Sequence, residues 1–412
     1  MKKRIVLLFL ILSCFINIAY SQVSECHCKT DLIFLNEKIR KIPAYKQNKK
    51  SYENSYSKIL EKADSASSLY DCQILLNTLL LSINDNHSKI YSINKGATEE
   101  IKQSPDKLSE FKKSKIYNTF PKPNINLDSL QTILQSKPLE DIEGIYSNKN
   151  NLTIGVFKTQ KSENYQAIIL KSGSDIWTRG EIIYTLIPFG NDYLLNIGGN
   201  TSSKRLIAYT ERIANGYFYY MDFKKEERQK NYSFETLSED TYHREELSDD
   251  ITYLRVGSFS SWYPKLGDAE KFYKTLEANL NKSHLIIDIR NNGGGGNRNS
   301  NILYKLIKSY AKKNKVYVLM NHRTLSNAEQ FAYKLSKLDN CQLFGQRTNG
   351  TLAYEVNDDI YNLPCNQLMA VLPSKKKSDY IKFESLGIKP DKELNMDSDW
   401  IIQLKSIIEK NH

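Results

Sequence analysis

A serine three residues before a glutamate is the first candidate for a catalytic residue in this sequence. Ser326 lies in the run TLSNAE at residues 324–329, directly before an apolar helical stripe. A serine at the positive end of a helix is well placed where negative charge develops, as a hydrolytic nucleophile requires. The Ser-x-x-Glu spacing of Ser326 and Glu329 is also that of a helix capping box. This run alone therefore fits either a nucleophile or a cap.

A glycine-rich loop is the second candidate. Residues 288–296 read DIRNNGGGG and join a buried apolar run to a helical one. Glycines let backbone N–H groups face a ligand without obstruction by a Cβ atom. A dinucleotide-binding loop is excluded because Arg298 stands where the third glycine belongs, and a P-loop is excluded because no Gly-Lys-Ser/Thr follows. An oxyanion hole and a flexible turn remain as alternatives.

A serine nucleophile needs a base, which is most often histidine. Asp85-Asn86-His87 ends a helical stretch, and His322 lies close to Ser326 in sequence but just past a predicted strand. Spacing alone does not choose among the six histidines of the chain: His27, His87, His243, His284, His322 and His412.

The elements that must position these residues alternate between strand and helix. Apolar runs at 251–256, 285–289, 316–320 and 342–344 predict strands, and helical stripes at 266–280, 302–310 and 328–338 separate them. This βαβ alternation predicts a parallel sheet covered by helices, with function at the carboxyl ends of its strands. Residues 226–412 are therefore expected to form an α/β core.

The chain before this core divides into two parts. Apolar residues recur at helical spacing over 29–83, and a looser, proline-containing stretch follows to about residue 137, so residues 22–138 are expected to be a helical region that carries His87. Short apolar runs separated by turn residues fill 139–223. This pattern predicts a small β-barrel or sandwich over 139–225.

Residues 1–21 have the features of a secretory signal peptide: a basic start at Lys2–Arg4, an apolar run and the cleavage site Ala19-Tyr20-Ser21. The apolar run is short for a membrane span, which takes ~20 residues, and no later stretch is long enough. We expect an exported protein, periplasmic or extracellular, with no integral membrane segment after processing. Export permits disulfides, so Cys26 or Cys28 is expected to pair with Cys72, and Cys341 with Cys365.

Composition sets further bounds. The chain has 412 residues, 40% of them hydrophobic and 25% charged, which is enough to bury a core. Its formal net charge is +11, but the basic residues are spread along the chain and the longest pure run is Lys375–Lys377. We interpret them as a solvated surface and expect no nucleic-acid partner.

Taken together, the motifs resemble those of the tail-specific, or C-terminal processing, serine peptidases. The loop at 288–295 is similar to the family's Asp-x-Arg-x-Asn-x-Gly-Gly, and 324–329 to its Thr-x-Ser-x-x-Glu turn. Residues 345–350, GQRTNG, and 384–391, ESLGIKPD, resemble the later Gly-x-x-Thr-x-Gly and Glu-x-x-Gly-Val-x-Pro-Asp segments. The order and spacing of all four carry the resemblance.

Within this family the chain resembles the tricorn-core branch. The Ser–Lys branch has its lysine base just after the Gly-x-x-Thr-x-Gly loop, where this chain has Thr351. The tricorn-like branch uses an Asp-x-His motif, matched by His87, and a glutamate matched by Glu384. Tricorn has serine before that histidine, whereas this chain has Asn86.

The resemblance implies a crotonase/ClpP-like core and an exported serine peptidase that acts on proteins or peptides, without metal or cofactor. Ser326 would be the nucleophile, His87 the base and Glu384 the residue that orients the base. The backbone N–H groups of Asn327 and Gly294 would form the oxyanion hole. Two other functions remain open: a non-catalytic binding protein on the same fold, and a crotonase-type acyl-CoA enzyme, against which the export signal argues.

Overall fold

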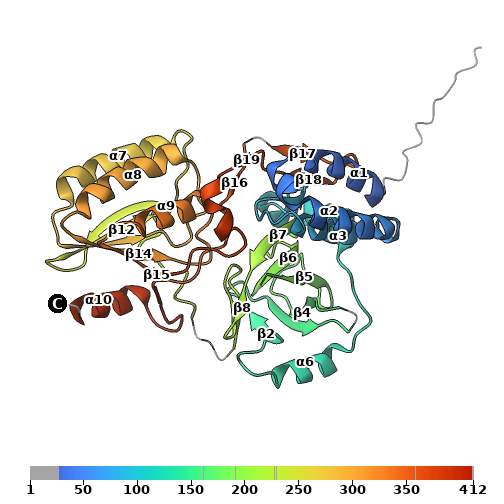
Figure 1. Cartoon of the computed structure of the whole chain (residues 1–412). Coiled ribbons are helices and arrows are strands. Elements are labelled where there is room, and N and C mark those ends of the chain that lie inside the picture. Colours follow the sequence, from blue (N-terminus) through green and yellow to red (C-terminus); the bar gives the residue numbers. More distant parts are fainter. Residues whose placement is uncertain are drawn as a thin grey trace, which may run out of the picture.

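The computed structural model describes residues 27–410, apart from positions 161, 191, 227, 229 and 358. The predicted signal peptide at residues 1–21 lies outside this range. Figure 1 shows an α/β lobe on one side, and helices with a β-rich sheet on the other. No helix among the described residues combines the length and apolar character needed to cross a membrane.

The first helices of the chain pack together and lead to His87. Ser68 caps the third of them, because its side chain accepts a hydrogen bond from the N–H of Asp71 at 3.0 Å. Most of the segment from 29 to 83 is helical, as the apolar periodicity predicts. The helices of the N-terminal region are α1 (Cys28–Ile39), α2 (Pro43–Lys62), η1 (Ala63–Ser65), α3 (Leu69–Leu81), α4 (Glu99–Gln103), α5 (Pro105–Phe111), η2 (Tyr117–Thr119) and α6 (Leu127–Gln135).

The cysteines divide into one confirmed and one incorrect pairing. Cys28 and Cys72 form a disulfide that links α1 to α3, with Cα atoms 5.4 Å apart. The predicted bond between Cys341 and Cys365 is wrong, because Cys341 is a buried free thiol while Cys365 is disulfide-bonded elsewhere. Cys341 opens a central strand of the core, where it serves as a small apolar side chain.

The β-rich part is one nine-stranded antiparallel sheet, in the order β7-β6-β5-β4-β3-β2-β10-β9-β8, which curls into a nearly closed barrel. Helix α3 contacts this sheet: Tyr70 Oη lies 3.0 Å from Thr185 Oγ1, and Gln73 Nε2 donates to Ile207 O at 3.1 Å. The strands are β2 (Gly144–Ser147), β3 (Thr153–Lys158), β4 (Tyr165–Lys171), β5 (Ile182–Phe189), β6 (Tyr193–Gly199), β7 (Leu206–Glu211), β8 (Ile213–Ala214), β9 (Tyr217–Phe218) and β10 (Lys224–Lys225).

The α/β lobe contains a six-stranded sheet in the order β11-β12-β13-β14-β15-β20. Its strands run parallel from β12 to β20, and β11 adds an antiparallel edge. The four strands predicted from apolar runs are present, and each end lies within one residue of the predicted one. The elements are β11 (Tyr242–Glu246), β12 (Ile251–Val256), α7 (Lys265–Asn279), β13 (His284–Asp288), α8 (Asn297–Tyr310), β14 (Lys315–Met320), α9 (Asn327–Leu335), β15 (Cys341–Gly345), β20 (Lys392–Glu393) and α10 (Trp400–Lys410).

One small antiparallel sheet joins the N-terminal region to the C-terminal part of the chain, and a second one lies within the C-terminal part. Strand β1 (Lys89–Ser92) begins two residues after His87 and pairs with β18 (Leu368–Val371), which in turn pairs with β17 (Ile360–Asn362). Strands β16 (Tyr354–Glu355) and β19 (Lys375–Lys376) pair nearby, before η3 (Ser378–Phe383). This pairing fixes the His87 segment against residues that are far away in sequence.

Candidate active site

Ser326 lies in a tight turn between β14 and α9. Its backbone has φ 55° and ψ −122°, a conformation that residues other than glycine rarely adopt and that costs on the order of 1–3 kcal/mol. Its N–H donates to Glu329 Oε2 at 2.9 Å, across the first turn of α9. The strained turn is therefore held by the helix that follows it, and the Ser326 side chain projects at the N-terminal end of α9.

Glu329 is more than a helix cap. Its buried carboxylate also accepts from Thr348 Oγ1 at 2.6 Å, Gly350 N at 2.7 Å and Thr351 N at 2.9 Å. Burial raises the pKa of Glu329 to about 7. The capping role was predicted from the Ser-x-x-Glu spacing, but the bonds to residues 348–351 were not, because hydrogen bonds across 19 or more residues leave no local pattern.

His87 contacts Ser326 directly. Its Nε2 atom lies 3.1 Å from Ser326 Oγ, within hydrogen-bond reach for a nucleophile and its base. The backbone N–H of His87 donates to Asp85 Oδ1 at 2.9 Å, which fixes the loop that carries the ring. Burial, and then the nearby charge of Lys89, lower the pKa of His87 to about 3. The imidazole is therefore neutral near pH 7 and able to accept a proton.

Glu384 lies behind His87 without a direct hydrogen bond to its ring. Its carboxylate accepts from the backbone N–H groups of Asn86 at 2.8 Å, Leu352 at 3.0 Å and Ala353 at 2.7 Å. The Nδ1 atom of His87 is buried and has no hydrogen-bond partner among the described residues. Glu384 therefore positions the backbone beside His87. Burial and the neighbouring charge of Asp85 raise the pKa of Glu384.

Asn86 directs its side chain away from the His87 ring. Its Nδ2 donates to Gly350 O at 2.9 Å, and its Oδ1 accepts from Ser385 Oγ at 3.3 Å. Asn86, which stands where tricorn has a serine, thus places its side-chain amide between the loops that contain Gly350 and Ser385. Only the backbone N–H of Asn86 reaches Glu384, so the connection from Glu384 toward the histidine loop runs through the main chain.

Lys89 was not identified from the sequence as part of this site. Its buried Nζ donates to Asn86 O at 2.7 Å, and burial lowers its pKa to about 8. The charges of Asp85 and Glu384 act in the opposite direction and favour the ammonium. The position of Lys89 two residues after His87 was the available signal, but a lysine in a four-residue strand is usually exposed.

One group could hold a metal ion among the described residues: Asp85, His87 and Glu384, whose ligand atoms lie within 4.8 Å of one another. The Glu384 oxygens are occupied by the three amides named above, and Asp85 accepts from His87 N and from Ser88 Oγ at 2.7 Å. The ammonium of Lys89 also lies beside these carboxylates. These contacts disfavour a cation, and the expectation that no metal or cofactor is needed stays a prediction.

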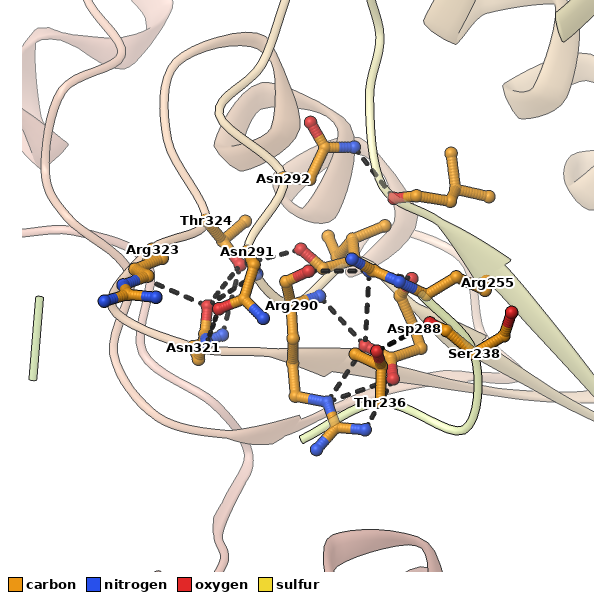
Figure 2. A network of polar contacts seen from close by, with 12 residues as sticks. Thr236, Ser238, Arg255, Asp288, Arg290, Asn291, Asn292, Asn321, Arg323 and Thr324 are labelled. Atoms are coloured by element: carbon orange, nitrogen blue, oxygen red, sulfur yellow. Dashed lines mark hydrogen bonds and ion pairs between the residues drawn. The ribbon is translucent and has the colours of Figure 1, made fainter. Parts of the chain in front are cut away.

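The glycine-rich loop is fixed by a polar network at the carboxyl ends of the strands (Figure 2). Arg290 holds Asp288 through Nε and Nη2, with distances of 2.6–3.0 Å. Asn321 bridges to the loop, because its Oδ1 accepts from Asn291 N at 3.0 Å and its Nδ2 donates to Asn291 Oδ1 at 2.8 Å. Thr324 Oγ1 donates to Ile289 O at 3.0 Å. The network therefore joins the loop to the Ser326 turn.

The two predicted oxyanion donors differ in the structure. The Asn327 N–H has no hydrogen-bond acceptor among the described residues, so it is free to bind a developing oxyanion. The Gly294 N–H instead donates to Asn292 Oδ1 at 2.8 Å. Gly294 is nevertheless adjacent to the nucleophile, because a Cβ atom there would lie 2.9 Å from Ser326 Cβ and 3.0 Å from Asn327 N.

Gly295 is a second possible source of an oxyanion donor. Phe259 N donates to Gly294 O at 3.0 Å, and Gly296 N donates to Phe259 O at 2.8 Å. These two bonds form a parallel bridge between Phe259 and Gly295. In such a bridge Gly295 directs its own N–H away from Phe259. The Gly295 N–H has no acceptor among the described residues.

His322, the histidine nearest to Ser326 in sequence, does not reach the nucleophile. It is fully buried, and its Nε2 lies 3.3 Å from Thr210 O. Burial lowers its pKa to about 3, and its ring stacks on Tyr193 with centroids 5.7 Å apart. His322 therefore serves the packing between the barrel and the α/β lobe.

The comparison with protein families concerns the α/β lobe. Residues 250–308 and 296–394 match peptidase family S41. These segments contain the glycine-rich loop, Ser326 and Glu384, whereas His87 lies before them. No curated protein matches the chain.

Solved structures of peptidases are similar over most of the chain. Mature CPAF is 11% identical with a TM-score of 0.45, over 93% of this chain and 96% of that one. The photosystem II D1 C-terminal processing protease is 13% identical with a TM-score of 0.35, over 89% and 94%. The tricorn protease is 14% identical with a TM-score of 0.41, over 93% of this chain and 37% of that one.

Proposed function

Because the chain is a member of peptidase family S41 and a serine-type peptidase, we propose that it is an exported endopeptidase in which Ser326 and His87 cut peptide bonds through an acyl-enzyme. The distance of 3.1 Å between His87 Nε2 and Ser326 Oγ is the observation that carries the proposal. The two residues lie 239 positions apart, so no local pattern brings them together.

The first half of the reaction transfers the acyl group to the enzyme. His87 Nε2 takes the hydroxyl proton while Ser326 Oγ attacks the scissile carbonyl. The resulting oxyanion accepts from the Asn327 N–H and from a second donor in the glycine-rich loop, either Gly295 or Gly294 once it leaves Asn292. The protonated His87 then gives its proton to the leaving amine, and the carbon–nitrogen bond breaks.

The second half releases the acyl group. Water attacks the ester carbonyl and gives a proton to His87, and the Ser326–acyl bond breaks as that proton returns to Oγ. Glu384 keeps the histidine loop in place by binding the backbone of Asn86 and of residues 352–353. It is a positioning residue, since no hydrogen bond joins it to the ring.

The proposal includes a crotonase/ClpP-like core and an exported location. The parallel order of strands β12, β13, β14 and β15, with helices between them, supports the core assignment. The Cys28–Cys72 disulfide supports export, because such bonds persist in oxidising compartments. The substrate is then a protein or peptide outside the cytoplasm.

A fluorophosphonate probe and a peptide library test the proposal together. Purified protein without its first 21 residues should be labelled covalently at Ser326 and should cleave a subset of the library. Ser326→Ala should remove both signals, and His87→Ala should slow the labelling strongly. If the unmodified protein is neither labelled nor active on the library, the non-catalytic binding function replaces this proposal.

A further inference from the structure

A cavity of about 230 Å³ opens beside His87, between the barrel and the small sheet that contains β1 and β18. Its walls come from separate parts of the chain: Tyr91 on β1, Val371 on β18, Leu325 just before the nucleophile, and Tyr209 and Tyr220 from the β-rich part. Its volume lies below the ~300–1,000 Å³ of pockets for drug-sized ligands. A cavity of this size suits one side chain of a substrate.

The wall is mostly aromatic and aliphatic. Tyr209 and Tyr220 stack with ring centroids 4.7 Å apart, and both line the cavity with Tyr91. Burial raises the pKa of each of the three phenols, so they are neutral near pH 7. Leu325, Val356 and Val371 supply the aliphatic part. Such walls favour apolar side chains, because each buried CH₂ contributes about 0.8 kcal/mol.

The described lining offers no partner for a basic side chain. Among the described residues, no aspartate or glutamate lines the cavity, whereas Lys89 does. The charges behind the wall are mixed, because Arg205 and Arg323 act on Tyr209, whereas Arg323 and Glu211 act on Tyr220. An acidic side chain gains little from Lys89, because the charges of Asp85 and Glu384 already act on its ammonium and its Nζ donates to Asn86 O. The charge balance thus leaves neutral side chains.

We propose that this cavity binds a neutral aromatic or large aliphatic side chain of the peptide substrate, next to the bond that Ser326 cuts. The inference rests on the proposed peptidase function and adds its substrate class. It also gives the β-rich sheet a role, since Tyr209 and Tyr220 from that part of the chain form one wall of the cavity. The barrel is then a specificity element of the active site.

The test compares matched fluorogenic peptides that differ only at the residue next to the scissile bond. The unmodified protein should have a kcat/KM for Phe or Leu peptides at least about tenfold above that for Lys or Asp peptides, a difference of about 1.4 kcal/mol. A preference for Lys or Asp overturns the inference while leaving the peptidase function intact. Failure to cut any peptide, with no probe labelling, would instead refute the peptidase function.

Two variants place a carboxylate in the cavity. Val356→Asp lies at the rim, where the side chain is 40% exposed, and Val371→Asp lies deeper. Val356→Asp should raise the ratio of Lys to Phe cleavage at least about tenfold by attracting the basic side chain. Val371→Asp should raise it less, because Val371 lies opposite Lys89 in the β1–β18 pairing and the new carboxylate meets that ammonium. Ile402→Asp is the matched control, since Ile402 is 69% exposed on α10 and outside the cavity lining. An unchanged ratio in Val356→Asp protein that unfolds at the parent temperature overturns the inference.

A third variant tests the barrel wall by size. Tyr220→Ala removes one ring of the stack and should shift the preference from Phe toward Trp peptides by several fold. Tyr209→Phe should leave the preference for Phe over Lys in place, because it removes only a hydroxyl group. If Tyr220→Ala lowers cleavage of all peptides by the same factor, the ring has no part in side-chain selection and the inference fails.

Discussion

His87 Nε2 lies 3.1 Å from Ser326 Oγ, although the two residues come from distant parts of the chain. His87 lies in the loop after α3, and Ser326 lies in the turn after β14. The contact depends on two long-range connections. Strand β1, which follows His87, pairs with β18, and Glu384 binds the backbone of Asn86. The geometry of the pair is therefore set by the C-terminal half of the chain as much as by the loop that carries His87.

Replacing Ser326 should separate reactivity from backbone strain. Ser326→Ala should lower kcat by at least about a thousandfold, because the oxyanion hole and binding alone retain little catalysis. Ser326→Gly should be equally inactive yet more stable than the alanine variant by on the order of 1 kcal/mol, since glycine tolerates φ 55° and ψ −122°. Peptide cleavage and thermal unfolding of both variants measure the two effects. Equal stability of the two would contradict the strain argument.

Glu384 and Asn86 should respond differently to truncation. Glu384→Ala leaves three backbone N–H groups without their acceptor, at about 1–3 kcal/mol for each one that stays buried. It should lower both the unfolding temperature and kcat, the latter by about a hundredfold. Asn86→Ala loses a side-chain bond to Gly350 O but keeps its backbone N–H, so kcat should stay within about tenfold. A larger loss in Asn86→Ala would show that the side chain, not the main chain, connects Glu384 to the base.

The sequence predicts the parallel strands well because buried strands of an α/β sheet are continuous apolar runs. Strand β11, with the letters YHREE, was missed because it is a charged edge strand that pairs on one side only. The motif resemblance predicted the contact between His87 and Ser326. It did not predict that Asn292 occupies the Gly294 N–H, since that bond depends on the local rotamer of a buried amide.

The incorrect cysteine pairing has a similar origin. Cys341 opens a predicted strand and Cys365 lies in the next predicted extended run, and neither run shows which cysteines come close in space. Cys341 lies in β15, where burial raises the pKa of its thiol to about 12, so it is also poorly reactive. The Cys28–Cys72 pair was easier to predict, because both cysteines lie within one short helical region.

The two neighbouring glycines of the loop offer a matched test of its packing against the nucleophile. A Cβ atom on Gly294, which has φ +91°, would lie 2.8 Å from Leu325 O and would displace the Ser326 turn. Gly294→Ala should therefore lower kcat by about a hundredfold, comparable to the loss of an oxyanion donor. Gly293→Ala meets nothing within 4 Å and should cut within about twofold of the parent. Similar activities of the two variants would refute this contact.

Removal of the disulfide should destabilise the helices that lead to His87. Replacing Cys28 and Cys72 together by alanine should lower the free energy of unfolding by about 2–5 kcal/mol. Cys341→Ala is the control, because its thiol is free and lies in the α/β sheet. Thermal unfolding under non-reducing conditions compares the variants. If the double variant unfolds at the temperature of the control, the bond does not contribute to stability.

The acid limit of activity should lie below the pKa of an ordinary histidine. Burial and Lys89 lower the pKa of His87 to about 3, against about 6.5 in the unfolded chain, so the folded state binds fewer protons between these values. Stability contributed by neutral His87 is thus complete above pH 6.5 and is lost as the pH falls toward 3. The acid limb of kcat/KM should accordingly fall well below pH 6.5.

Lys89→Met should move the acid limb of kcat/KM toward higher pH. Removing the ammonium takes away one of the two effects that lower the pKa of His87 and leaves burial as the other. Lys49→Met on the exposed side of α2 should leave the limb in place. The kcat/KM profile from pH 4 to 9 measures the shift, and an NMR titration of the His87 ring in Ser326→Ala protein assigns it to that residue. An acid limb at pH 6.5 that Lys89→Met does not move would show that His87 titrates as a solvent-exposed imidazole and that the buried lysine does not act on it.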